Sequence, residues 1–138
     1  EWTGSDFASN LITATIFGSR IADPLQVERE SAYALFNQTT SATNVGLELL
    51  ATMRRGPYVA TANYTYVQSR EGREDARQDA ELTPRHSAGL VGMWEAEDVG
   101  RLGLEIYYTG RQRLEVNPYR DESRPYVVVG VLAERRIG

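Results

Sequence analysis

The chain has 138 residues, which is enough for one domain with a hydrophobic core and too few for two. It has no cysteine, which excludes disulfide bonds and thiolate metal sites. Its formal net charge of -4 gives no basic field of the kind that nucleic acid requires, so no nucleic-acid partner is expected.

No stretch of the sequence predicts a transmembrane helix, because no apolar run approaches the roughly 18 residues that such a helix needs. The first ten residues also lack the basic-then-apolar profile of a signal peptide. Strands of a membrane barrel leave a weaker trace, about ten residues of alternating polarity between turns. That trace is present along most of the chain.

The first two segments, residues 8–30 and 32–54, are expected to be long antiparallel strands. In the second, Val45 and its alternate neighbours form an apolar face, whereas Glu48 lies on the opposite face. Both segments are longer than a bilayer requires, so their tips should project beyond the lipid. Pro24 cannot donate to a strand ladder, and we expect it at a bulge or at a sheet edge.

The third segment, residues 57–70, alternates most clearly. Tyr64 and Tyr66 share an aromatic and apolar face, and Thr61 and Asn63 share a polar one. Membrane-facing aromatic side chains explain this pattern with fewer assumptions than a carbohydrate-binding platform does.

The fourth segment, residues 85–97, begins at the boundary between a charged loop and an apolar strand. Pro84 ends the loop, and Arg85 and His86 are expected at the level of the lipid headgroups. Trp94 follows on the same face as His86, about 27 Å along an extended chain, which suits the opposite aromatic girdle.

The last two segments are residues 100–116 and 124–137. In the former, Leu104 and its alternate neighbours oppose Glu105 and Tyr107. The latter is apolar on both faces, so periodicity does not orient it.

The connections between these segments differ in length in a regular way. Short turns at 54–57 and 97–101 alternate with long charged loops at 69–85 and 113–125. Such asymmetry is typical of outer-membrane barrels, whereas a soluble meander usually keeps both ends short. The sequence therefore predicts an all-β fold, an antiparallel up-and-down meander of about six long strands.

Five short segments resemble, in order and spacing, those of one protein family. They are an aromatic-bearing strand with an acidic end, a Gly-x-Glu strand, an aromatic strand, a Pro-x-His strand start and a strand ending in Tyr-x-Gly-Arg-Gln. These stand at Phe17 to Asp23, Gly46 to Glu48, Asn63 to Tyr66, Pro84 to His86, and Tyr108 to Gln112. Over nearly its whole length, the chain resembles the C-terminal part of the barrel of TonB-dependent outer-membrane receptors.

The resemblance implies that residues 1–138 are a partial barrel domain, a segment of a barrel with about 22 strands, without plug domain or signal peptide. It implies energy-coupled uptake of a siderophore-iron complex, corrinoid, other metal complex or sugar across the outer membrane of a Gram-negative bacterium. The implied partners are outer-membrane lipid, the plug and remaining strands of the receptor, the TonB protein and the small-molecule cargo. As an isolated piece, soluble or refolded, the sheet is expected to be open, curled or oligomerised.

Two sets of candidate site residues follow, and neither includes a catalytic residue, a cofactor ligand or a metal ligand. The candidate lumen or loop ligand contacts, which charge pairing with neighbouring strands or the plug would also explain, are Glu105, Tyr107, Arg111, Arg113 and Arg85. The candidate membrane-interface aromatics are Tyr64, Tyr66, Trp94 and Tyr108.

Metal binding and catalysis find little support in the sequence. The single histidine, His86, has no second ligand at the usual spacing, and the acidic side chains of Asp75, Asp79 and Glu81 alternate with arginines in a solvated loop. No serine has a visible His-Asp partnership, so no enzyme is expected. Two other functions stay open, a soluble small-molecule carrier of lipocalin type and a structural or adhesive β-module.

Overall fold

The computed structural model describes residues 8–22, 25–29, 33–37, 41–72, 77–114 and 117–136. This part of the chain contains strands and no helix, and hence no helix that is long and apolar enough to cross a membrane. The strands are β1 (Ser9–Ala22), β2 (Leu25–Arg29), β3 (Tyr33–Asn37), β4 (Ser41–Arg55), β5 (Tyr58–Gly72), β6 (Gln78–Asp79), β7 (His86–Ala96), β8 (Gly100–Thr109) and β9 (Tyr126–Arg135).

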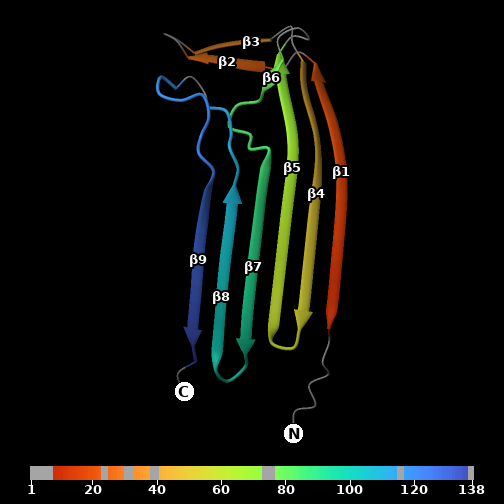
Figure 1. Ribbon diagram of the computed structural model, residues 1–138, viewed down its shortest axis with the longest axis vertical. Coiled ribbons are helices and arrows are strands. Elements are labelled where there is room, and N and C mark those ends of the chain that lie inside the picture. Colours follow the sequence, from red (N-terminus) through yellow and green to blue (C-terminus); the bar gives the residue numbers. More distant parts are fainter. Residues whose placement is uncertain are drawn as a thin grey trace.

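Six long strands lie side by side in the order β1-β4-β5-β7-β8-β9, and every neighbouring pair is antiparallel (Figure 1). The short strand β6 pairs with the end of β5, and β2 and β3 form a separate two-stranded sheet. The predicted all-β antiparallel meander is therefore confirmed. The long strands lie side by side in the order in which they occur in the chain, as sequential strands commonly do.

The two segments predicted as single long strands, 8–30 and 32–54, are each divided in two. Ala22 pairs with Ser41, and the next described pair is Leu25 with Asn37, so two residues on one side correspond to three on the other. The register of the β2–β3 hairpin is thus shifted by one residue, which ends the β1–β4 ladder. Pro24, expected at a bulge or an edge, lies outside the described residues. The segment predicted at 100–116 also differs, since β8 ends at Thr109.

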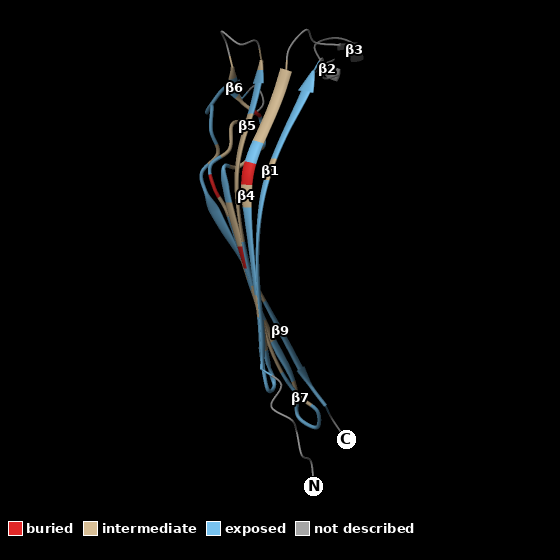
Figure 2. Ribbon diagram, turned by 90° about the vertical axis from the view of Figure 1, so that its right-hand side faces the viewer, coloured by how far each residue is buried: buried red, intermediate tan, exposed pale blue. Residues whose placement is uncertain are grey.

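The main sheet is a single twisted layer that is open on both faces (Figure 2). Among the hydrophobic side chains of the described residues, only Ala80 is buried, whereas Ile16 and Val131 are 82% and 76% exposed. Of the three arrangements expected for the isolated chain, the structure has the open one. The strands are therefore held by their backbone ladders and cross-strand side-chain pairs rather than by a core.

A cross-strand contact between an aromatic ring and a glycine strengthens the sheet where it lacks a core. Phe17 on β1 lies opposite Gly46 on β4, and its ring occupies the space that a Cβ of Gly46 would take. Gly46 is one of the few buried residues as a result. At Gly89 on β7, the Asn63 side-chain oxygen occupies this space, and the Tyr107 ring of β8 lies next to it. An aromatic ring that covers a strand glycine makes up for the side chain that the glycine lacks.

We expect Gly46→Ala to lower the free energy of unfolding by about 1–3 kcal/mol, because the new Cβ would displace the Phe17 ring and meet the backbone oxygen of Tyr66. Gly92→Ala is the matched control, since a Cβ there meets no atom within 4 Å. Guanidinium titrations of both variants, followed by circular dichroism of the strand signal, measure the difference. Equal midpoints for the two variants would show that the ring contact does not stabilise the sheet.

Candidate functional site

The antiparallel register divides the side chains of the six long strands between two faces. Residues that pair across neighbouring strands project to the same side of a sheet. We call one side the apolar face, and it carries Ile12, Leu49, Tyr64, Leu90, Leu104 and Val129. We call the other side the polar face, and it carries Thr15, Glu48, Thr65, Asn63 and Glu105.

The apolar face has the height of a lipid hydrocarbon layer. On β5, Tyr58 and Tyr66 are eight residues apart, about 27 Å along the strand. A tilted strand crosses a bilayer with about 9–11 residues. Apolar side chains fill this height on all six long strands, including β9, where Val127, Val129 and Val131 pair with alternate residues of β8.

Aromatic side chains lie near both ends of the apolar face. Tyr58 pairs with Trp94 at the end where the turns are short. Tyr64, Tyr66 and Tyr108 lie toward the end with the long loops. The structure thus places the four aromatic residues singled out from the sequence on one face, with Trp94 at the opposite end from the other three.

His86 belongs to the aromatic group at the loop end of the apolar face. Its Nδ1 atom is 2.8 Å from the Tyr64 hydroxyl, and its ring centroid is 5.1 Å from that of Tyr66, its cross-strand partner. The described residues include no group of three or more His, Asp and Glu side chains that could hold a metal ion. Asp75, weighed above as a cation ligand, lies outside them. His86 is thus an exposed member of an aromatic group.

The polar face carries Glu105 and Tyr107, the first two candidate ligand contacts. The Tyr107 ring leans over Gly89, beside the Asn63 amide. The Glu105 side chain lies beside Gly130 of β9, its cross-strand partner. Nearer the short turns, Arg101 donates from Nε to Glu134 at 2.8 Å.

The other candidate contacts lie in the loops and not in the same row of β8. Arg111 and Arg113 follow the end of the strand at Thr109. The Arg85 guanidinium forms an ion pair with the Asp79 carboxylate, and Arg113 donates to the backbone oxygen of Asp79 at 3.5 Å. The structure therefore brings Arg85 and Arg113 together around Asp79. Glu105 and Tyr107 are not part of this group, because they project from the polar face of β8.

Backbone hydrogen bonds join the loops at this end. The Leu82 amide donates to Arg113 at 2.8 Å, and the Ala80 amide donates to Ser69 at 2.9 Å. Within the loop between β8 and β9, the Ser123 amide donates to Gln112 at 2.9 Å. The loops therefore continue the pairing of the sheet beyond the apolar face.

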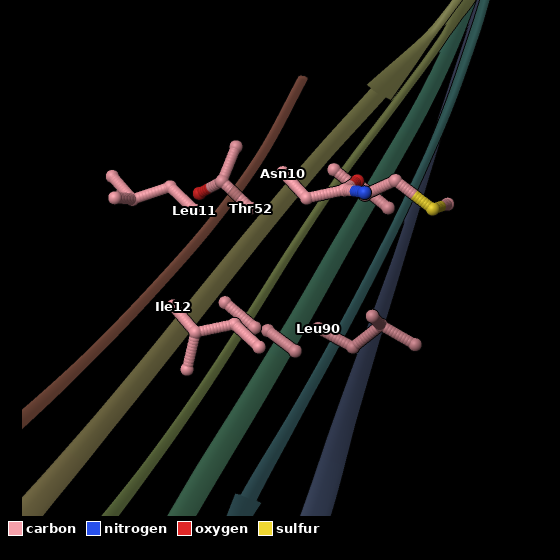
Figure 3. Close-up of a pocket in the computed structure, with 9 residues that line it drawn as sticks. Asn10, Leu11, Ile12, Thr52 and Leu90 are labelled. Carbon is pink, nitrogen blue, oxygen red and sulfur yellow. The ribbon is translucent and has the colours of Figure 1, made fainter. Parts of the chain in front are cut away.

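A shallow apolar depression of about 210 Å³ lies on the sheet near the short-turn end (Figure 3). On the apolar face, Ile12 and Leu90 stand at either end of one cross-strand row, with Ala51 and Ala62 between them. Small side chains between larger ones create the depression. The sequence does not predict this depression, because Ala51 and Ala62 come together only through the cross-strand register.

The chain was compared with known proteins. No protein-family model, no curated protein and no solved structure matches it.

We expect Tyr64→Phe to change the imidazole resonances of His86, because the substitution removes the hydroxyl that bonds to Nδ1. His86 is the only histidine, so its signals in a nitrogen-15 NMR spectrum are unambiguous. Tyr108→Phe is the control, since Tyr108 shares the face but no described hydrogen bond joins it to His86. Unchanged His86 resonances in Tyr64→Phe would contradict the contact.

Proposed function

We propose that this chain forms part of the barrel wall and outer loops of a TonB-dependent receptor in the outer membrane of a Gram-negative bacterium. The receptor takes up a scarce nutrient with energy supplied through TonB. The observation that carries the proposal is the uninterrupted apolar face of six antiparallel strands, about as tall as a bilayer and edged by aromatic residues at both ends.

Exposure of the apolar face supports a lipid environment. Leu102, Leu104 and Val129 are 52%, 42% and 59% exposed, and no other described element packs against them. Monomeric soluble proteins rarely expose apolar patches beyond a few hundred Å². Lipid chains would cover the whole face without any further contact from the protein.

The ends of the sheet support an orientation in the membrane. Tight turns at Gly56–Pro57 and 97–99 join β4 to β5 and β7 to β8. Longer connections join β5 to β7 and β8 to β9 at the opposite end (Figure 1). Outer-membrane barrels have short periplasmic turns and longer external loops, so the loop end would face outward.

The polar face would then line the lumen. The unpaired edges of β1 and β9 would continue into the remaining strands, because a membrane barrel has to satisfy every backbone group within the wall. The resemblance adds the plug domain inside the barrel and TonB as the energy-coupling partner. Its cargo would be a siderophore-iron complex, a corrinoid, another metal complex or a sugar.

The candidate ligand contacts divide between lumen and loops in this proposal. Glu105 and Tyr107 would face the lumen, whereas Arg85, Arg111 and Arg113 would belong to the outer loops. A lipocalin-type carrier or an adhesive module would need protein to cover the apolar face. The described strands neither close into a barrel nor form a second layer, which favours the membrane wall.

Accessibility of single cysteines in native outer membranes tests this proposal. The chain has no cysteine, so each introduced thiol is the only one it contributes. We expect a water-soluble maleimide to label Asn63→Cys and Glu105→Cys, and to leave Ala62→Cys and Leu104→Cys unlabelled until detergent is added. The physical reason is that residues at successive positions face water and lipid in turn.

Each of these pairs differs by one position on the same strand, so local mobility and depth are matched. Equal labelling within both pairs would contradict a membrane wall, and reversed labelling would show that the faces are exchanged. Loss of nutrient uptake on removing TonB, with labelling unchanged, would separate the receptor function from barrel formation.

A further inference from the structure

Charged side chains are sorted between the two faces of the long strands. The glutamates of these strands, all of which project from the polar face, are Glu48, Glu71, Glu95, Glu105 and Glu134. The arginines on the apolar face, all near its ends, are Arg20, Arg55, Arg70 and Arg135. The apolar face of the long strands therefore has cationic borders and no carboxylate.

Two of these arginines form a pair at the loop end. Arg20 and Arg70 both pair with Thr43, from the two sides of β4, so their Cα atoms are about 10 Å apart on one face. Both side chains are exposed. No hydrogen bond or ion pair joins either guanidinium to another described residue.

The pair lies at a defined height above the aromatic group. Arg70 follows Tyr66 by four residues on the same face, about 13 Å along β5. Gln68, which pairs with Val45, lies between them and carries no charge. With the tilt of a barrel strand, the arginines would stand about 10 Å beyond the aromatic row, in the headgroup region.

Among the described residues, one carboxylate on the same face stands next to the pair. Asp79 on β6 pairs with Arg70, on the side away from Thr43. Its carboxylate oxygen, however, accepts a hydrogen bond from the Arg85 guanidinium in an ion pair. Arg85 therefore supplies the counter-charge for Asp79, so that no described carboxylate is paired with Arg70.

We propose that Arg20, Thr43 and Arg70 bind the phosphate of an anionic lipid headgroup at the outer border of the apolar face. Guanidinium groups bind phosphate oxygens through paired N–H donors, and the Thr43 hydroxyl between them supplies a further donor. The opposite border has no such pair, because Arg55 and Arg135 lie on strands that are not near neighbours. The inference depends on the proposed function, in which the apolar face meets lipid.

The experiment uses the full chain in detergent micelles, with short-chain phosphatidylglycerol and short-chain phosphatidylcholine as probes. Native mass spectrometry measures the dissociation constant of each lipid. We expect Arg20→Gln/Arg70→Gln to weaken phosphatidylglycerol binding about tenfold and phosphatidylcholine binding by less, because the choline cation offsets the charge of its phosphate. Arg54→Gln/Arg120→Gln is the control with the same net charge, since Arg54 projects from the polar face and Arg120 lies in a loop.

Three results would overturn the proposal. Equal weakening in the two double variants would show that only net charge matters. Displacement of the lipid by inorganic phosphate at constant ionic strength would show a site for free phosphate. The third result concerns the proposed function. In a Trp2→Phe background Trp94 is the only tryptophan, and we expect brominated detergent to quench its fluorescence. Absence of quenching would mean that the apolar face does not meet the micelle. Quenching with equal lipid binding in both double variants would reject the lipid site alone.

Discussion

The cross-strand register is the constraint on which the rest of this structure depends. Because side chains alternate along each strand, a slip of one residue in any ladder would move that strand's apolar side chains to the polar face. Ile12, Ala51, Ala62, Leu90, Ile106 and Val129 form one continuous row only because all five ladders keep their register. The same register sends every glutamate of the long strands to the other side.

The change of register at the loop end separates the β2–β3 hairpin from the main sheet. The β2–β3 hairpin is offset by one residue from the β1–β4 ladder and belongs to a separate sheet. On the other side of the loop end, β6 and the pairing of Leu82 with Arg113 add short backbone contacts to the main sheet. The regular ladders of β1, β4 and β5 thus extend past the aromatic group as far as Ala22, Ser41 and Gly72, and the segments beyond them follow their own pairing.

Period-two alternation is a local signal, which explains what the sequence could and could not predict. Tyr64 and Asn63 are assigned to opposite faces from their own strand alone, and the structure has them so. The last strand, apolar on both sides, is oriented only by its partner, because Val129 pairs with Ile106. The contact of His86 with Tyr64 and the pairing of Arg20 with Arg70 across Thr43 depend on residues far apart in the sequence. No single-strand pattern contains these contacts.

The polar face carries exposed apolar side chains as well as polar ones. These apolar side chains indicate which kind of surface would pack against it. Toward β1 and β4 it carries Thr15 and Glu48, but also Leu11 and Ile21, which are 59% and 51% exposed. Toward β9 it carries Val128 and Leu132, which are 52% and 54% exposed. Apolar side chains that face water lack the free energy that burial would give them. A protein surface packed against the polar face would cover these side chains, and in the proposed receptor a plug domain would supply it.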